Sequence, residues 1–178
     1  EFRVCSSDLG QTYINPDEKL QAEYEQKRVA YLEEKAALAQ FVGKETKTAD
    51  GVKVELCANI GKPEDALKVV ECDGEGIGLF RTEFLFMDRP QIPTEEEQFA
   101  AYKKVAETLE GKPVIIRTLD VGGDKEIPYL ALEKEENPFL GFRAIRLCLK
   151  REDLYRPQLK ALLRASAYGD IRIMVPMV

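Results

Sequence analysis

From residue 52 onward, strand-type and helix-type segments alternate along the chain. Between Val52 and Ala58 apolar and polar residues alternate, which is the period of a strand with one buried face. Further strands are predicted at 76–81, 114–119 and 171–176, with helices at 64–72, 95–109 and about 159–169. This order is typical of an α/β domain built on a parallel sheet.

Local signals support these boundaries. Thr94-Glu95-Glu96-Glu97 has the form of a capping box and predicts a helix start. Residues 114–119 are apolar enough to predict a strand buried on both faces. Residues 120–138 are predicted to form a long loop, and the pattern at 142–149 fits either a strand or a helix.

A different pattern precedes this domain. Asn15-Pro16 is predicted to cap and open a long helix that ends near Gly43. Apolar residues near heptad spacing predict that one face of this helix packs on something: Leu20, Tyr24, Tyr31, Leu38 and Phe41. A solvated connecting helix is favoured over a coiled-coil dimer, and both remain open.

The resulting division has three parts. Residues 1–12 match nothing that follows in pattern, are predicted to be a non-native leader, and are left out of the fold argument. Residues 13–50 are predicted to be a helical linker, and residues 51–178 an incomplete α/β barrel. A (β/α)₈ barrel typically needs about 250 residues. The predicted fold is therefore the first half of such a barrel, about four βα units, preceded by a long linker helix.

Composition narrows the classes of function. A formal net charge of −6 argues against nucleic acid as the main partner, but it does not exclude a small anion. No apolar run approaches the roughly 20 residues of a membrane span, and a cytoplasmic protein is expected. The four cysteines lack CxxC spacing, which favours reduced thiols over a metal site or disulfides and leaves a reactive thiol as the alternative. The sequence has no histidine, so no phosphohistidine can form within it.

Three arginines are the candidate binding residues: Arg81, Arg117 and Arg143. The first two lie at or near the C-terminal ends of successive predicted strands, the edge where barrel enzymes build their sites. A guanidinium group matches phosphate or carboxylate with two parallel hydrogen bonds. The alternative is that these are surface arginines paired with nearby acids, Arg81 with Glu83 and Arg117 with Asp120.

A glycine pair follows the third predicted strand, in Gly122-Gly123-Asp124-Lys125. Glycine allows backbone N–H groups to come close to an anion, so this segment could be a phosphate-approaching loop. A plain turn is the favoured interpretation.

Several blocks together resemble one enzyme family. They are Ala58-Asn59-Ile60-Gly61, Gly76 to Arg89, Ile116 to Lys125, Asn137 to Arg146, and Arg172 to Met177. In this order they resemble Enzyme I of the bacterial sugar phosphotransferase system, the phosphoenolpyruvate–protein phosphotransferases. The likeness runs from about Ile14 to the end of the chain.

The resemblance implies a phosphoenolpyruvate-binding (β/α)₈ barrel in a homodimeric cytoplasmic enzyme that uses Mg²⁺. The phosphoryl group would pass to a histidine on a separate domain and then to the carrier protein HPr. Arg81 and Arg117 match phosphoenolpyruvate-binding arginines, and Arg143 matches a further active-site arginine. The magnesium ligands and a cysteine proton donor are expected beyond Val178. No catalytic residue or metal ligand is therefore assigned within this chain, which is predicted to be inactive alone.

Two alternatives remain. The chain could belong to a related phosphoenolpyruvate-utilising enzyme, pyruvate phosphate dikinase or phosphoenolpyruvate synthase, although Phe84 to Arg89 favours Enzyme I. It could also be a non-catalytic fragment that binds an anion.

Overall fold

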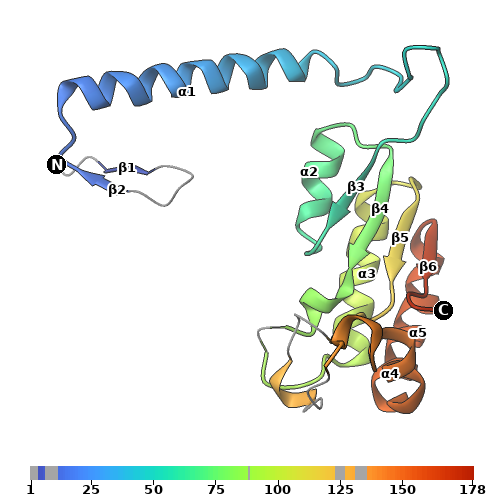
Figure 1. Cartoon of the computed structure of the whole chain (residues 1–178). Helices are drawn as coiled ribbons and strands as arrows, with labels where there is room; N and C mark the ends of the chain where they lie inside the picture. The colour runs from blue at the N-terminus through green and yellow to red at the C-terminus, as the bar shows by residue number, and fades with distance from the viewer. Residues whose placement is uncertain (1–3, 7–11, 88, 123–126, 131–135) are drawn as a thin grey trace. The chain divides into compact units, whose positions relative to one another are not determined.

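The computed structural model describes residues 4–6, 12–87, 89–122, 127–130 and 136–178 (Figure 1). The chain divides into two units, Glu1–Lys44 and Glu45–Val178. In the described part of the chain, no helix combines the length and the apolar character that crossing a membrane requires.

The first unit contains a short antiparallel strand pair and one long helix. Strand β1 (Val4–Ser6) pairs with β2 (Thr12–Ile14), and helix α1 spans Glu18–Ala39. None of the α1 residues is buried, and Tyr31 and Leu38 are each 62% exposed. Tyr24, on the predicted apolar face, meets the Tyr13 ring with centroids 6.1 Å apart. The packing of the rest of that face stays a prediction.

The ends of α1 also differ from the prediction. The helix cap is Asp17, whose carboxylate accepts a hydrogen bond of 2.7 Å from the Leu20 N–H. Asn15 instead has a φ of 49°, in the left-handed region that short polar side chains tolerate. Helix α1 ends at Ala39, and a turn then leads to Gly43.

The second unit is an α/β domain with a four-stranded parallel sheet in the order β3-β4-β5-β6 (Figure 1). The strands are β3 (Cys57–Ile60), β4 (Gly76–Arg81), β5 (Val114–Arg117) and β6 (Ile171–Met174). The helices are α2 (Asp65–Glu71), α3 (Glu95–Thr108), α4 (Ala144–Lys150) and α5 (Glu152–Ala165). Short 3₁₀ helices are η1 (Thr82–Leu85), η2 (Pro128–Leu130), η3 (Pro138–Leu140) and η4 (Ser166–Tyr168). The predicted parallel α/β arrangement is confirmed.

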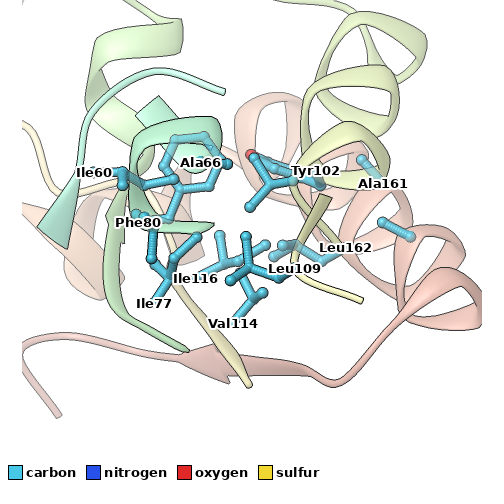
Figure 2. Packing of buried hydrophobic residues seen from close by; sticks show 13 residues of the cluster. Ile60, Ala66, Ile77, Phe80, Tyr102, Leu109, Val114, Ile116, Ala161 and Leu162 are labelled. Carbon is cyan, nitrogen blue, oxygen red and sulfur yellow. The ribbon is translucent and has the colours of Figure 1, made fainter. Parts of the chain in front are cut away.

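One face of this sheet packs against α2, α3 and α5 to form the core. Figure 2 shows the side chains that meet there, among them Ile77, Phe80, Val114 and Ile116 from the strands. The Phe80 and Tyr102 rings meet edge to face with centroids 5.9 Å apart. Such apolar burial is the main favourable term that holds helices on a sheet.

The start of α3 follows the predicted capping box. The Thr94 hydroxyl accepts a hydrogen bond from the Glu97 N–H, and the Glu97 carboxylate accepts one of 2.7 Å from the Thr94 N–H. Hydrogen bonds to the Glu97 carboxylate lower its pKa to about 2. The Thr94 backbone N–H makes the largest contribution, and the Arg89 guanidinium makes the next largest.

Several local predictions need correction. The first strand begins at Cys57 and not at Val52. The Leu56 carbonyl accepts a hydrogen bond from the Glu75 N–H, but the Leu56 N–H donates to the Glu75 carboxylate, and the Leu56 side chain lies largely in solvent. Strands β5 and β6 each end two residues earlier than expected, at Arg117 and at Met174. The ambiguous segment 142–149 forms helix α4 over most of its length.

The second face of the sheet is only partly covered. Residues Cys57, Leu79 and Ile115, on the face opposite the core, are half-buried, and Asn59 is exposed. The prediction that 114–119 is buried on both faces is therefore wrong. Within the described residues, β3 and β6 each pair with a strand on one side only. Parallel sheets are normally covered on both faces, so this surface is unusual.

We expect the 178-residue chain to self-associate when it is produced alone, because unpaired strand edges and a half-covered apolar face recruit other copies. Size-exclusion chromatography with light scattering should show species larger than one chain. Ile173→Lys, at the β6 edge, should reduce association more than Leu163→Lys on exposed α5 surface. A monodisperse monomer that melts cooperatively would contradict this expectation.

Candidate functional site

Two predicted site arginines end neighbouring strands. Arg81 is the last residue of β4 and Arg117 the last of β5, and the two are direct partners in the parallel register. Neighbouring strands lie about 4.8 Å apart, and partners in register point to the same side. Phe80 and Ile116 face the core, so Arg81 and Arg117 extend on the opposite, less covered face.

Arg81 has no ion pair among the described residues, and its Nε atom is buried without a hydrogen-bond partner. Its guanidinium lies 5.0 Å from the centre of the Phe84 ring, in a cation–π contact. Gly61 makes room for that ring, because a Cβ there would lie 3.0 Å from Phe84 Cδ2. The alternative in which Glu83 neutralises Arg81 is wrong, since Glu83 binds a different arginine.

Arg117 lies between two acidic side chains. Its Nη2 donates a 2.7 Å hydrogen bond to Glu83 Oε1, and its Nη1 lies 3.1 Å from Asp120 Oδ2. The predicted pairing of Arg117 with Asp120 is confirmed, and Glu83 is a second partner that sequence spacing did not reveal. Glu83 is fully buried, and a buried carboxylate requires such a partner.

Arg143 joins the same cluster through Asp120. Its Nε and Nη2 donate hydrogen bonds of 2.9 and 2.7 Å to Asp120 Oδ1. Arg143 lies directly before α4 and is 8% exposed. Gly122 has a φ of 122°, which side chains rarely tolerate, and a Cβ there would lie 2.9 Å from the Arg143 Cβ. Both the backbone conformation and the close contact therefore favour glycine at this position. Residues 123–125 of the predicted phosphate loop or turn lie outside the described residues.

The balance of charge at this cluster favours an anion. The cluster contains three guanidinium groups, those of Arg81, Arg117 and Arg143, and two carboxylates, those of Glu83 and Asp120. The carboxylates hold Arg117 and Arg143, while Arg81 contributes a positive charge without a counter-ion among the described residues. A phosphate or carboxylate ligand can supply that missing charge and accept hydrogen bonds from planar donors.

The same residues do not make a metal site. In the described ranges, no group of three or more His, Cys, Asp or Glu side chains is arranged to hold a metal ion. The two carboxylates that do converge, Glu83 and Asp120, already accept from arginines.

Sequence reasoning missed Thr82 and Gln158, which form hydrogen bonds next to the strand ends that carry Arg81 and Arg117. Gln158 is a fully buried residue of α5, and its amide hydrogen-bonds to Thr82 Oγ1 and to the Leu119 N–H. A signal was present, because position 158 falls on the same helix face as the buried Leu154, Ala161 and Leu162. A polar residue on an apolar helix face indicates a buried hydrogen-bond network.

Removing the shared carboxylate tests the cluster. Asp120→Ala leaves Arg117 and Arg143 close together without the charge between them, so we expect the free energy of unfolding of the intact protein to fall by about 3 kcal/mol. Urea denaturation followed by circular dichroism measures this loss.

The matched control is Asp153→Ala, which removes an Arg151–Asp153 pair with side chains 36% and 55% exposed. It should cost no more than about 1 kcal/mol. Equal losses for the two variants would show that the Asp120 pairs are not energetically special.

Comparison of the sequence with known proteins identifies a family. Residues 35–178 match the family described as "PEP-utilising enzyme, PEP-binding domain", where PEP is phosphoenolpyruvate. Over 169 residues the chain is 60% identical to a phosphoenolpyruvate-protein phosphotransferase of Geobacillus stearothermophilus and 57% identical to one of Bacillus subtilis. Each match covers 95% of this chain.

A phosphoenolpyruvate-protein phosphotransferase of Staphylococcus carnosus is 57% identical over 175 residues, or 98% of this chain. The chain spans only 29–30% of the length of these curated relatives. The family match itself extends over most of the sequence, from residue 35 to residue 178. The chain therefore belongs to the PEP-binding domain family of the PEP-utilising enzymes.

Proposed function

We propose that this chain is the phosphoenolpyruvate-binding part of a phosphoenolpyruvate–protein phosphotransferase. The observation that carries the proposal is the pair formed by Arg81 and Arg117, which end adjacent parallel strands on one face of the sheet. Arg81 lacks an ion pair among the described residues, and its neighbour Arg117 is held by two carboxylates. The identities of 57–60% with proteins of that name support the choice within the family.

Phosphoenolpyruvate presents a phosphate and a carboxylate, and both match guanidinium groups. We assign Arg81 and Arg117 to the phosphoryl group, because they lie together at the strand ends, and Arg143 to the same site as a third cation. As the phosphoryl group leaves phosphoenolpyruvate, charge develops on its oxygens and on the leaving enolate. Guanidinium groups that are already fixed in position stabilise that charge without reorganising.

The transfer needs groups that this chain does not contain. The bond between phosphorus and the enol oxygen breaks, a bond from phosphorus to a histidine nitrogen forms, and the enolate takes up a proton to become pyruvate. The sequence has no histidine, so the acceptor belongs to another part of the enzyme. The proposed next acceptor is the carrier protein HPr, and the sugar phosphotransferase system is the proposed setting, in the cytoplasm.

We further propose that residues 51–178 form the first half of a (β/α)₈ barrel and that residues 13–50 form a helical linker. Four parallel strands in sequential order and the half-covered face of the sheet support this proposal. In a complete barrel that face lines the interior, and further strands pair with the edges of β3 and β6. The assignment of residues 1–12 as a non-native leader stays a prediction.

Magnesium chemistry is not built from these residues. Glu83 and Asp120 already accept from arginines, and the described residues offer no cluster for a metal ion. The proposal that the enzyme uses Mg²⁺ therefore requires ligands other than these two carboxylates. Homodimer formation is likewise a proposal for the whole enzyme.

Arg81→Ala is the most direct mutational test in the full-length protein, because it removes a cation without leaving a described carboxylate unpaired. Charge-assisted hydrogen bonds contribute roughly 1.5–3 kcal/mol each. We therefore expect kcat/KM for phosphoenolpyruvate to fall by about 10²-fold, measured as phosphoenolpyruvate-dependent labelling of the protein.

Arg156→Ala is the control, because Arg156 pairs with Glu152 on α5 and its side chain is 71% exposed. That variant should retain wild-type kcat/KM. An Arg81→Ala protein that stays within twofold of wild type would refute the proposed function.

A further inference from the structure

Gln158 connects helix α5 to the ends of both arginine-bearing strands. It is fully buried, and its Oε1 accepts a hydrogen bond of 2.9 Å from the Leu119 N–H. Its Nε2 lies 3.2 Å from Thr82 Oγ1 and 3.3 Å from Tyr102 Oη. Both ends of this amide are therefore used, as a buried polar group requires.

The partners of Gln158 adjoin the site arginines in the chain. Thr82 directly follows Arg81, and Leu119 lies two residues after Arg117. The Thr82 hydroxyl also donates a hydrogen bond of 2.8 Å to the Arg117 carbonyl. Gln158 therefore reaches the backbone beside Arg117 by two routes, through Leu119 and through Thr82.

The orientation of the Gln158 amide is fixed from the opposite side. Burial raises the pKa of Tyr102, so its hydroxyl stays protonated and donates to Gln98 Oε1 at 3.2 Å. The Nε2 of Gln98 in turn donates to the Pro93 carbonyl at 3.1 Å. With the Tyr102 proton directed to Gln98, the Tyr102 oxygen is free to accept from Gln158. In this arrangement each of these hydrogen bonds has a donor and an acceptor.

We propose that Gln158 is a positioning residue that holds the ends of β4 and β5 in register, so that Arg81 and Arg117 are presented to the phosphoryl group together. The inference rests on the proposed function. Gln158 does not touch the ligand, and it acts through the Thr82 hydroxyl and the backbone of residues 117–119. A displacement of about 1 Å at a reacting group can cost about 10²-fold in rate.

The first test replaces the amide with an apolar side chain of similar size. Gln158→Met in the full-length protein leaves the buried Leu119 N–H without its acceptor, and we expect kcat/KM for phosphoenolpyruvate to fall about 10-fold or more. The control is Val114→Ala, a buried site at the start of β5, at the end of the strand away from Arg117. A loss of kcat/KM that merely followed the fall in Tm in both variants would overturn the inference.

A second pair of variants keeps the test decisive even where Gln158→Met does not fold. Thr82→Val removes the hydroxyl that joins Gln158 to the Arg117 carbonyl, whereas Thr82→Ser keeps it. We expect Thr82→Val to lose activity about as much as Gln158→Met, and Thr82→Ser to stay near wild type. Equal activities for these two variants would overturn the inference.

A double-mutant cycle separates positioning from the proposed function. If Gln158 acts through the arginines, Gln158→Met should cost less than twofold in kcat/KM once Arg81→Ala is present. Losses that multiply in the double variant would contradict positioning. Should Arg81→Ala alone lower kcat/KM while Gln158→Met and Thr82→Val do not, the inference fails and the proposed function stands. Should Arg81→Ala have no effect, the proposed function itself fails.

Discussion

The parallel pairing of β4 with β5 is the constraint on which the candidate site depends. Because both strands run in the same direction and end in register, their last residues, Arg81 and Arg117, lie side by side. Two like charges on adjacent strands repel each other unless anions lie nearby. The acidic neighbours of Arg117 and the proposed anionic ligand are both consistent with that arrangement.

Among the described residues, the carboxylates near the site neutralise some of its arginines but not all of them, which favours an anionic ligand. Glu83 and Asp120 hold Arg117, and Asp120 is shared with Arg143, so two guanidinium groups are fixed before any ligand arrives. Arg81 is steadied by the Phe84 ring instead of a carboxylate. This division gives preorganised hydrogen-bond donors together with one uncompensated charge among the described groups, a combination that suits phosphoryl binding.

Much of the fold was predictable because its signals are local. The capping box at Thr94, the end of β4 at Arg81 and the alternation of strands with helices depend on short-range chemistry. What failed depended on tertiary pairing. Spacing suggested that Glu83 neutralises Arg81, but the 3₁₀ turn after β4 directs Glu83 to the neighbouring strand. Gln158 was missed because its partners lie 39 and 76 residues away.

The most direct test of this account is a crystal structure of the full-length protein with phosphoenolpyruvate bound. The account predicts phosphoryl oxygens at hydrogen-bond distance, about 2.7–3.2 Å, from guanidinium nitrogens of both Arg81 and Arg117. Glu83 and Asp120 should keep their arginine partners in that complex. A phosphoryl group bound elsewhere, or an Arg81 turned away and paired with a carboxylate, would contradict the account.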